Sequence, residues 1–277
     1  MRMLISADME GATGVTWPAD VRPGSEQWQR FRRLLTADVN AAVAGFYHAG
    51  AAGVLVTEAH STMRNVLLEE LDERAVMLTG RHKDLTMIEG IQRDDVAGVA
   101  FVGYHAGAGT EGVLAHTYLP NSITAVRVNG GPASEGQLNA YVAHEYGVPV
   151  ILVTGDDRTC ADAASYAPAA PKVAVKECVS RYSAVCLPPA VTAAAIRSAA
   201  SQAAALAGRR PPALGARFGV EIEVDAAQLA QAAALVPGVR RTGDRTVVYE
   251  SSSAREMIRC FKVVAVMISD AREDFYG

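Results

Sequence analysis

The chain has 277 residues, half of them apolar, which is enough for one large domain or for one domain with a smaller one attached. Its net charge of −4 gives no excess of Lys and Arg, and no run of about 18 apolar residues occurs, so we expect neither nucleic acid nor a membrane as a partner. The four cysteines form no C-x-x-C pair, which argues against a zinc ribbon or a disulfide framework. Free thiols and the lack of a recognisable leader sequence predict a cytoplasmic location.

Short apolar runs alternate with helical patterns in the first part of the chain. The apolar runs predict strands at residues 1–8, 53–60, 98–105, 123–130 and 148–157. Helical patterns lie between them at residues 26–51, 61–72 and 135–147. The first of these ends at a glycine, Gly50, and the third at Gly147, as helices often do. This alternation predicts an α/β fold with a doubly wound, mostly parallel sheet.

The composition changes after residue 190. Residues 190–208 have an alanine-rich helical pattern, and the sequence RRPPALG at residues 209–215 is the best linker candidate. Residues 216–225 then alternate with the period of a half-buried strand, and an alanine-rich helix, a strand near 246–251 and a helix from Ala254 follow. We therefore predict two domains, a larger α/β domain at residues 1–190 and a smaller C-terminal α/β domain at 191–277.

Polar side chains of one chemical type stand at the ends of three predicted strands. Asp8 and Glu10 follow the first strand, His60 ends the second and His105 ends the third. The carboxyl ends of parallel strands meet at one edge of a sheet, where α/β proteins bind ligands. Each histidine taken alone could simply bond a backbone carbonyl, but the four residues together predict a shared site.

Two further residues are candidates for the same edge. His116 lies in the connection that follows the third strand, and Glu135 follows a glycine-rich loop at the start of a predicted helix. A first-turn acid stabilised by the helix dipole is the simpler interpretation of Glu135. The other three histidines lie within helical patterns (His48, His144) or in a polar stretch (His82), and we interpret them as surface or core residues.

This mixture of carboxylates and imidazoles is chemistry that suits a transition metal. Oxygen and nitrogen ligands together favour zinc, with manganese or cobalt possible, over calcium or magnesium. One ion needs only three or four ligands, so the five residues Asp8, Glu10, His60, His105 and Glu135 suggest two ions with a carboxylate between them. Asp8, on the central first strand, is the natural bridge. The domain at residues 1–190 is then the metal-binding and catalytic one.

Several short motifs resemble the zinc-dependent D-aminopeptidase family of bacteria. They are SADMEG at residues 6–11, His60 with Ser61, GYHA at 103–106, His116, EGQLNAY at 135–141, GDD at 155–157 and AVKECVSRYSAVCL at 174–187. The resemblance implies that Asp8, Glu10, His60, His105 and Glu135 bind two zinc ions and that His116 is a catalytic histidine beside them. It also implies removal of N-terminal D-residues from short peptides, and assembly into ring-like homo-oligomers, typically decamers of stacked pentamers.

The chain departs from the family pattern beside two of these residues. Thr57, Glu58 and Ala59 precede His60, where family members tend to have Asp and Ser, and Ser134 precedes Glu135 in place of glycine. Because these residues flank candidate ligands without replacing them, the departures bear on substrate range more than on metal binding.

Two other classes of function compete with this interpretation. Residues 107–112, GAGTEG, formally match a dinucleotide-binding fingerprint, but Pro120 and the lack of a helical pattern after them argue against a nicotinamide-dependent dehydrogenase. A hydrolase of another amide or ester, or a metal-binding subunit without catalysis, could use the same core. We expect metal-assisted hydrolysis of an N-terminal peptide bond, with His116 either in proton transfer or as an alternative nucleophile.

Overall fold

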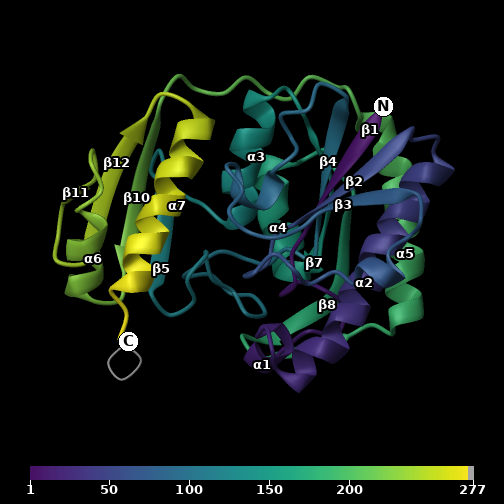
Figure 1. Ribbon diagram of the computed structural model, residues 1–277, viewed down its shortest axis with the longest axis horizontal. Coiled ribbons are helices and arrows are strands. Elements are labelled where there is room, and N and C mark those ends of the chain that lie inside the picture. Colours follow the sequence, from purple (N-terminus) through teal and green to yellow (C-terminus); the bar gives the residue numbers. More distant parts are fainter. Residues whose placement is uncertain (274–277) are drawn as a thin grey trace.

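A seven-stranded sheet forms the larger part of the molecule in the computed structural model, which describes residues 1–273 (Figure 1). The strand order is β3-β2-β1-β4-β7-β8-β9, and every neighbouring pair is parallel except β8 and β9. The strands are β1 (Arg2–Ala7), β2 (Gly53–Glu58), β3 (Ala75–Leu78), β4 (Val96–Val102), β7 (Val150–Asp156), β8 (Lys172–Ser180) and β9 (Ser183–Cys186). The predicted mostly parallel α/β fold is confirmed, and β1 lies inside the sheet between β2 and β4.

Two long helices, α2 (Glu26–His48) and α5 (Pro189–Ala203), cover one face of this sheet. Ile5 of β1, Val43 of α2 and Ile196 of α5 are fully buried in the core between them. The two helices approach closely at Gly45, where a Cβ atom would lie 2.3 Å from the carbonyl oxygen of Arg197. A glycine is therefore needed in the middle of α2, despite its low helix propensity.

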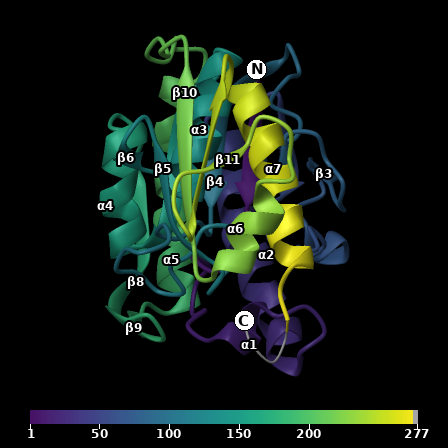
Figure 2. The same ribbon diagram turned by 90° about the vertical axis from the view of Figure 1, so that its left-hand side faces the viewer.

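The opposite face of the sheet packs on α3 (Glu135–Glu145) and α4 (Asp157–Tyr166), and its core continues into a second sheet. The second sheet is antiparallel, with the order β11-β12-β10-β5-β6. Its strands are β5 (Ile123–Val128), β6 (Gly131–Pro132), β10 (Phe218–Val224), β11 (Arg240–Arg241) and β12 (Thr246–Ser251). Helices α6 (Ala227–Ala233) and α7 (Ala254–Asp270) pack against it, and α7 also contacts α3 (Figure 2).

The strand predicted at residues 123–130 does not join the parallel sheet. It forms β5, which pairs antiparallel with β10, so that Val126 lies opposite Ile222. Val126 and Val128 are buried while Arg127 between them is half-buried, a pattern typical of an antiparallel sheet with one wet face. The domain boundary at residue 190 stays a prediction. Strand β5 precedes residue 190 but belongs to the second sheet, and α5 follows residue 190 but packs on α2 of the first part.

The helix predicted at residues 61–72 is wrong. This segment is irregular apart from a short 3₁₀ turn, η1 (Leu68–Glu70). The backbone N–H groups of Asn65 and Val66 both donate to Oε1 of Glu58, at 2.7 and 2.6 Å, and this pairing replaces the first hydrogen bonds of a helix. Ser61 and Met63 also have positive φ angles, which helical residues do not adopt.

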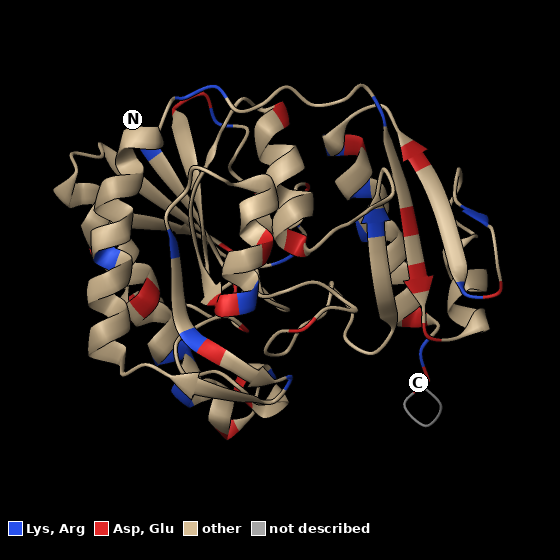
Figure 3. Cartoon of the chain, turned by 180° about the vertical axis from the view of Figure 1, so that it is seen from behind, with Lys and Arg blue, Asp and Glu red and all other residues tan. Residues whose placement is uncertain are grey.

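The remaining elements are short. They are α1 (Pro18–Val21), η2 (Thr86–Ile88) and η3 (Ala204–Leu206). Acidic and basic residues are distributed over both parts of the molecule (Figure 3). Among the described residues, no helix combines the length and the apolar character that crossing a membrane requires.

Candidate metal centre

The candidate ligands from the first three predicted strands meet at one edge of the parallel sheet. Asp8 and Glu10 follow the end of β1, His60 comes two residues after β2, and His105 comes three residues after β4. Because β2, β1 and β4 are parallel neighbours, their carboxyl ends place all four side chains together. All four are buried, with exposed fractions of 8% or less.

The loop after β1 is fixed by close backbone contacts. The N–H of Gly11 donates to the carbonyl of Gly103 at 2.8 Å, and a Cβ atom on Gly11 would lie only 1.7 Å from the carbonyl oxygen of Tyr104. The final glycine of the motif SADMEG therefore allows the loops after β1 and β4 to touch. The buried ammonium of Lys176 donates to three carbonyls of the same loop, those of Glu10, Ala12 and Val15, at 2.6, 3.0 and 2.6 Å.

Glu135 reaches the same edge of the sheet from the start of α3. Glu135 is the first residue of α3, after Ser134, whose hydroxyl oxygen caps the helix by accepting from the N–H of Gln137. Oε1 of Glu135 also accepts from the backbone N–H of Tyr118 at 2.6 Å. This bond points the carboxylate away from its own helix and into the centre, so Glu135 is more than a first-turn acid.

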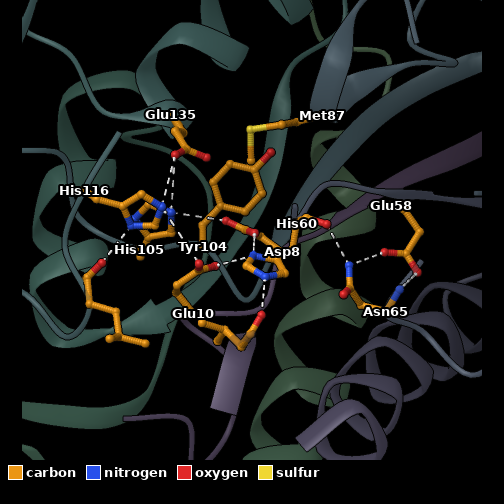
Figure 4. A network of polar contacts seen from close by, with 12 residues as sticks. Asp8, Glu10, Glu58, His60, Asn65, Met87, Tyr104, His105, His116 and Glu135 are labelled. Carbon is orange, nitrogen blue, oxygen red and sulfur yellow. Dashed lines mark hydrogen bonds and ion pairs between the residues drawn. The ribbon is translucent and has the colours of Figure 1, made fainter. Parts of the chain in front are cut away.

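Asp8 lies between two of the histidines (Figure 4). Its Oδ1 is 3.6 Å from Nδ1 of His60, and its Oδ2 is 3.4 Å from Nε2 of His105. The two oxygens of one carboxylate thus face two different imidazoles. This is the arrangement that a carboxylate shared between two neighbouring ions requires.

The other two carboxylates also contact imidazoles. Oε2 of Glu10 is 3.0 Å from Nδ1 of His60, and Oε1 of Glu10 is 3.8 Å from Nε2 of His116. Oε1 of Glu135 is 3.5 Å from Nε2 of His105 and 3.9 Å from Nε2 of His116. The rings of His105 and His116 stack almost parallel, with their centroids 4.2 Å apart. The structure therefore brings together all six residues singled out from the sequence.

Each histidine has one ring nitrogen on a backbone carbonyl and the other toward the carboxylates. The N–H of the first nitrogen donates from His60 Nε2 to Val21, from His105 Nδ1 to Ala106 and from His116 Nδ1 to Leu114, at 2.7, 3.0 and 2.8 Å. Such a bond fixes the tautomer, so that in the neutral ring the inward nitrogen has a lone pair, as is usual for metal-binding histidines. The same three histidines thus bond a backbone carbonyl and face the carboxylates of the candidate centre.

The electrostatics of the cluster are strongly perturbed. Burial, followed by repulsion from Glu10, raises the pKa of Asp8 to about 7. Burial acts to lower the pKa of His105, but attraction to Glu135 and Asp8 overcomes it and raises this pKa to about 10. Burial and the neighbouring His105 lower the pKa of His116 below its ordinary value. The pKa of His105 is thus raised and that of His116 lowered, although the two rings are stacked.

The donor set fits divalent metal ions. Oδ2 of Asp8 and Oε2 of Glu10 are buried, and within residues 1–273 no hydrogen-bond donor faces them when the imidazoles are neutral. Buried carboxylate oxygens without a partner are costly, and a cation in contact with them removes this cost. Donor atoms suited to one ion converge in two overlapping groups, one of Asp8, Glu10 and His105 and one of His105, His116 and Glu135.

A second layer of residues, which the sequence did not reveal, supports this centre. The hydroxyl of Tyr104 contacts Oγ of Ser6 at 2.7 Å and accepts from Nδ2 of Asn139 at 3.0 Å, beneath the ligands. Nδ2 of Asn65 donates both to the carbonyl of His60 and to Oε2 of Glu58, at 2.8 and 2.9 Å. These residues lie up to about a hundred positions apart in the chain. Ser6, Tyr104 and Asn139 stand within the motifs SADMEG, GYHA and EGQLNAY, but nothing in those motifs shows that the three side chains meet.

The centre opens into a cleft of about 890 Å³ between the sheet edge and α7. All six residues of the centre line it, together with Lys83, Tyr118, Lys262 and Val266. His82, which the sequence placed away from the site, also lines this cleft, whereas His48 and His144 lie at the ends of α2 and α3. His82 lies in the connection after β3, and β3 is the strand next to β2. This position at a strand end could have placed His82 near the centre.

The dinucleotide-binding interpretation of residues 107–112 is not supported by their conformation. The segment follows β4, but the chain continues as an irregular loop to β5 rather than as a helix. The fingerprint needs a helix N-terminus directly after the glycines to hold the pyrophosphate. Asp156 fixes this loop instead, because its Oδ2 accepts from the N–H of Val113 at 2.7 Å, three residues before His116.

Comparisons with known proteins agree with this geometry. A peptidase family described as D-aminopeptidase matches residues 1–263. A D-aminopeptidase of Bacillus subtilis (strain 168) is 34% identical over 271 residues, which cover 96% of each chain. A solved structure, described as Zn-dependent D-aminopeptidase DppA from Bacillus subtilis, a self-compartmentalizing protease, superposes with a TM-score of 0.92 at 32% identity, over 99% of this chain and all of the other.

Proposed function

The chain belongs to the D-aminopeptidase family, and from this premise we propose that it is a zinc-dependent aminopeptidase that hydrolyses the N-terminal peptide bond of short peptides beginning with a D-residue. The observation that carries this proposal is the buried cluster of three carboxylates and three imidazoles at the edge of the parallel sheet. The chemistry of these donors suits zinc, and the relative of known structure is described as Zn-dependent.

Five of the six residues would hold two zinc ions. Asp8 would bridge them, since its two oxygens face His60 on one side and His105 on the other. Glu10 lies on the His60 side and Glu135 on the His105 side. Zinc ions at such a site supply a water of lowered pKa and polarise the carbonyl of the scissile bond.

His116 is the residue that we propose to move protons. Its Nδ1–H is held by the carbonyl of Leu114, so Nε2 carries the lone pair that faces the centre and the cleft. Burial and His105 lower its pKa, so its imidazole is neutral at pH 7. A neutral Nε2 can take a proton from the attacking water and give it to the leaving amine, which general acid–base catalysis requires.

The handedness of the substrate follows from the family rather than from the centre itself. A di-metal centre defines the type of reaction, while the walls of the cleft decide which enantiomer fits. If the amine and the carbonyl are both anchored, the opposite enantiomer exchanges its side chain with the α-hydrogen and collides with the wall. Such a collision can exceed the ~1–3 kcal/mol that one methylene contributes to specificity.

The test is a panel of alanine dipeptides with the zinc-loaded enzyme. We expect fast hydrolysis of D-Ala-D-Ala, slow hydrolysis of L-Ala-L-Ala, and none of N-acetyl-D-Ala-D-Ala, measured by release of alanine. Loss of activity with a chelator and recovery with zinc, cobalt or manganese would show the metal dependence. Equal cleavage of the L-dipeptide, or efficient cleavage of the acetylated one, would contradict the proposed specificity.

The proposal extends to assembly and location. The Bacillus subtilis relative is described as self-compartmentalizing, and we propose that this chain forms a ring-like homo-oligomer, a decamer of stacked pentamers. A closed ring with its active sites facing the lumen would admit short peptides and exclude folded proteins. Cys160, Cys178, Cys186 and Cys260 are all free thiols, which suits the reducing cytoplasm as the place of action.

A further inference from the structure

Outside the metal centre, the wall of the cleft is basic. Six basic side chains and one acidic side chain, that of Asp270, line this part of the cleft. The basic residues are Arg22, Arg81, Lys83, Arg181, Lys262 and Arg272. A cleft with low-dielectric walls and charges of one sign concentrates ligands of the opposite sign. Since the carboxylates of the centre itself are committed to metal, the rest of the cleft favours an anionic group.

Three of these residues form a connected group, the basic cluster, made of Arg81, Lys83 and Lys262. Arg81 and Lys83 lie in the connection between β3 and η2, and Lys262 lies on α7, so the cluster joins two walls of the cleft. The ammonium of Lys262 donates to the carbonyl of Lys83 at 2.6 Å. This bond fixes the position of Lys262 relative to the sheet edge.

The basic cluster has hydrogen-bond donors to spare. The ammonium of Lys83 donates to Oγ1 of Thr57 at 3.1 Å and to the carbonyl of Glu58, which leaves one of its three N–H groups. Lys262 uses one N–H in the bond just described, which leaves two. The guanidinium of Arg81 makes neither an ion pair nor a hydrogen bond with any residue between 1 and 273.

The acid nearest in sequence does not neutralise the basic cluster. Asp84 follows Lys83 directly, but its two oxygens pair with two arginines on α7. Oδ2 is 3.2 Å from Nη2 of Arg255, and Oδ1 is 2.9 Å from Nε of Arg259. Asp84 therefore leaves the charges of Arg81 and Lys262 available to a ligand in the cleft. Lys83 is also attracted to the carboxylates of Glu58 and Glu89.

The basic cluster lies within reach of a short peptide cleaved at the metal centre. Lys83 is bonded to the carbonyl of Glu58, which precedes His60 by two residues, or at most about 7 Å of chain. A bound peptide in extended conformation covers about 3.3–3.6 Å per residue. The end of a di- or tripeptide whose first peptide bond lies at the centre can therefore approach the basic cluster.

The charges of such a peptide decide which of its ends lies there. The N-terminal ammonium is repelled by lysine and arginine, whereas the carboxylate at the other end is attracted to them. We propose that the basic cluster binds a carboxylate on the leaving portion of the substrate, and that this is the C-terminal carboxylate of a di- or tripeptide. This inference rests on the proposed aminopeptidase function and defines its substrate class, since a peptide with a blocked C-terminus lacks the group that is recognised.

Three substrates of the zinc-loaded enzyme test the proposal. D-Ala-D-Ala has the C-terminal carboxylate, D-Ala-D-alaninamide lacks it, and D-Ala-D-Glu α-amide has a carboxylate on its second side chain only. We expect kcat/KM for D-Ala-D-Ala to exceed that for D-Ala-D-alaninamide at least about tenfold, mainly through KM, as loss of a charged hydrogen bond implies. If D-Ala-D-Glu α-amide is cleaved faster than D-Ala-D-alaninamide, the basic cluster also accepts a side-chain carboxylate of the second residue.

Variants of Lys262 and Arg81 connect this preference to the basic cluster. Lys262→Met and Arg81→Met should each lower the ratio of kcat/KM between D-Ala-D-Ala and D-Ala-D-alaninamide severalfold, with zinc content unchanged. Arg197→Met is the control, because it removes one positive charge from an exposed position on α5, outside the cleft. It should keep the wild-type ratio.

The outcomes separate this inference from the function on which it rests. Equal kcat/KM for the free and amidated dipeptides would overturn the carboxylate site and leave the aminopeptidase intact. A Lys262→Met variant that loses activity on both dipeptides in proportion would show a structural lysine and would also overturn it. Cleavage of neither dipeptide by the zinc-loaded wild type would overturn the aminopeptidase function itself.

Discussion

His116 and His105 contact the same carboxylate, present parallel rings and bond backbone carbonyls in the same way, yet their environments give them opposite pKa shifts. His105 faces two carboxylates at 3.4 and 3.5 Å, whereas the nearest carboxylates of His116 are at 3.8 and 3.9 Å. His116 is thus the less tightly enclosed of the two, and it also lines a second cavity on the other side of its loop. This asymmetry favours His105 as the ligand and His116 as the proton carrier.

Substitutions at the centre should separate ligand from catalyst. Asp8→Ala removes the carboxylate between His60 and His105, so we expect loss of both zinc and activity. His116→Ala should keep two zinc ions per chain and lower kcat by about 10²- to 10⁴-fold, the usual worth of general acid–base catalysis. Elemental analysis and dipeptide kinetics on the same preparations measure both quantities.

A histidine outside the cleft provides the control for these variants. His144→Ala, at the end of α3, should change neither zinc content nor kcat. If His116→Ala lost one ion, His116 would join the ligands and the division of roles would be wrong. If it lowered kcat less than about tenfold, below the range for general acid–base catalysis, His116 would only position the substrate.

Zinc uptake should release protons. The pKa of His105 is raised to about 10 and that of Asp8 to about 7. Burial acts to lower the pKa of His60, but Glu10 and Asp8 overcome it and raise this pKa well above its ordinary value. At pH 7 the metal-free centre therefore holds protons on His105 and His60 and part of one on Asp8, and these must leave because ligands bind metal in their deprotonated forms. The apparent zinc affinity should rise with pH between about 7 and about 10, the interval between the pKa values of Asp8 and His105. Calorimetry in buffers of different ionisation enthalpy measures the protons released, and a binding heat independent of buffer would contradict the prediction.

The chemistry-bearing residues of the centre could be found from the sequence because each stands at the end of a strand or helix. Asp8, His60 and His105 follow apolar runs, and the convergence of parallel strand ends is a general rule. Tyr104, Asn139 and Lys176 could not be found in this way. Their roles depend on contacts between segments far apart in the chain, such as the bond from Lys176 to the carbonyl of Glu10.

At the scale of elements, β8 holds the loop that carries Glu10. Lys176 on this strand is almost fully buried and donates to three carbonyls of that loop. Lys176→Met leaves these buried acceptors without a donor, so we expect a loss of about 2–5 kcal/mol in the free energy of unfolding. We also expect weaker zinc binding, because the loop after β1 is released. Denaturant unfolding and zinc titration measure the two effects.

The same strand offers a matched control. Lys172 also donates to three backbone carbonyls, those of Ala167, Pro168 and Ala170, which belong to the loop after α4. Lys172→Met should lower the free energy of unfolding while zinc affinity stays at the wild-type level. Equal loss of zinc affinity in both variants would mean that overall stability, and not the position of the loop, governs metal binding.

The elements themselves were predicted where local pattern and tertiary environment agree. Helices α2 and α3 and strands β1, β2, β4, β7 and β10 lie where apolar periodicity and glycine stops put them. The helix predicted at residues 61–72 was wrong because the carboxylate of Glu58 accepts from the N–H groups of Asn65 and Val66, which a helix would use. The apolar run of β5 predicted a strand correctly but could not reveal its sheet, since pairing with β10 joins residues about a hundred positions apart.

For the whole molecule, the proposed ring predicts both mass and substrate range. Sedimentation velocity should show a closed particle many times heavier than the 29.2 kDa chain. The same preparation should cleave D-Ala-D-Ala and leave a folded protein intact, because narrow openings exclude folded chains. A monomer with full activity would contradict the assembly while leaving the metal centre unaffected.

The placement of β5 has a consequence for the synthesis of this protein. All six residues of the centre lie between positions 8 and 135, so each has been synthesised before half of the chain has been made. The loop with His116 is anchored on one side by β4 and on the other by β5, whose partner β10 begins only at Phe218. Domains fold from the N-terminus as they emerge, and pairings between distant segments form late. A nascent chain stopped before residue 218 therefore carries every chemical group of the candidate centre and the contact from Asp156 to the loop before His116, but it lacks β10, which anchors the far end of that loop through β5.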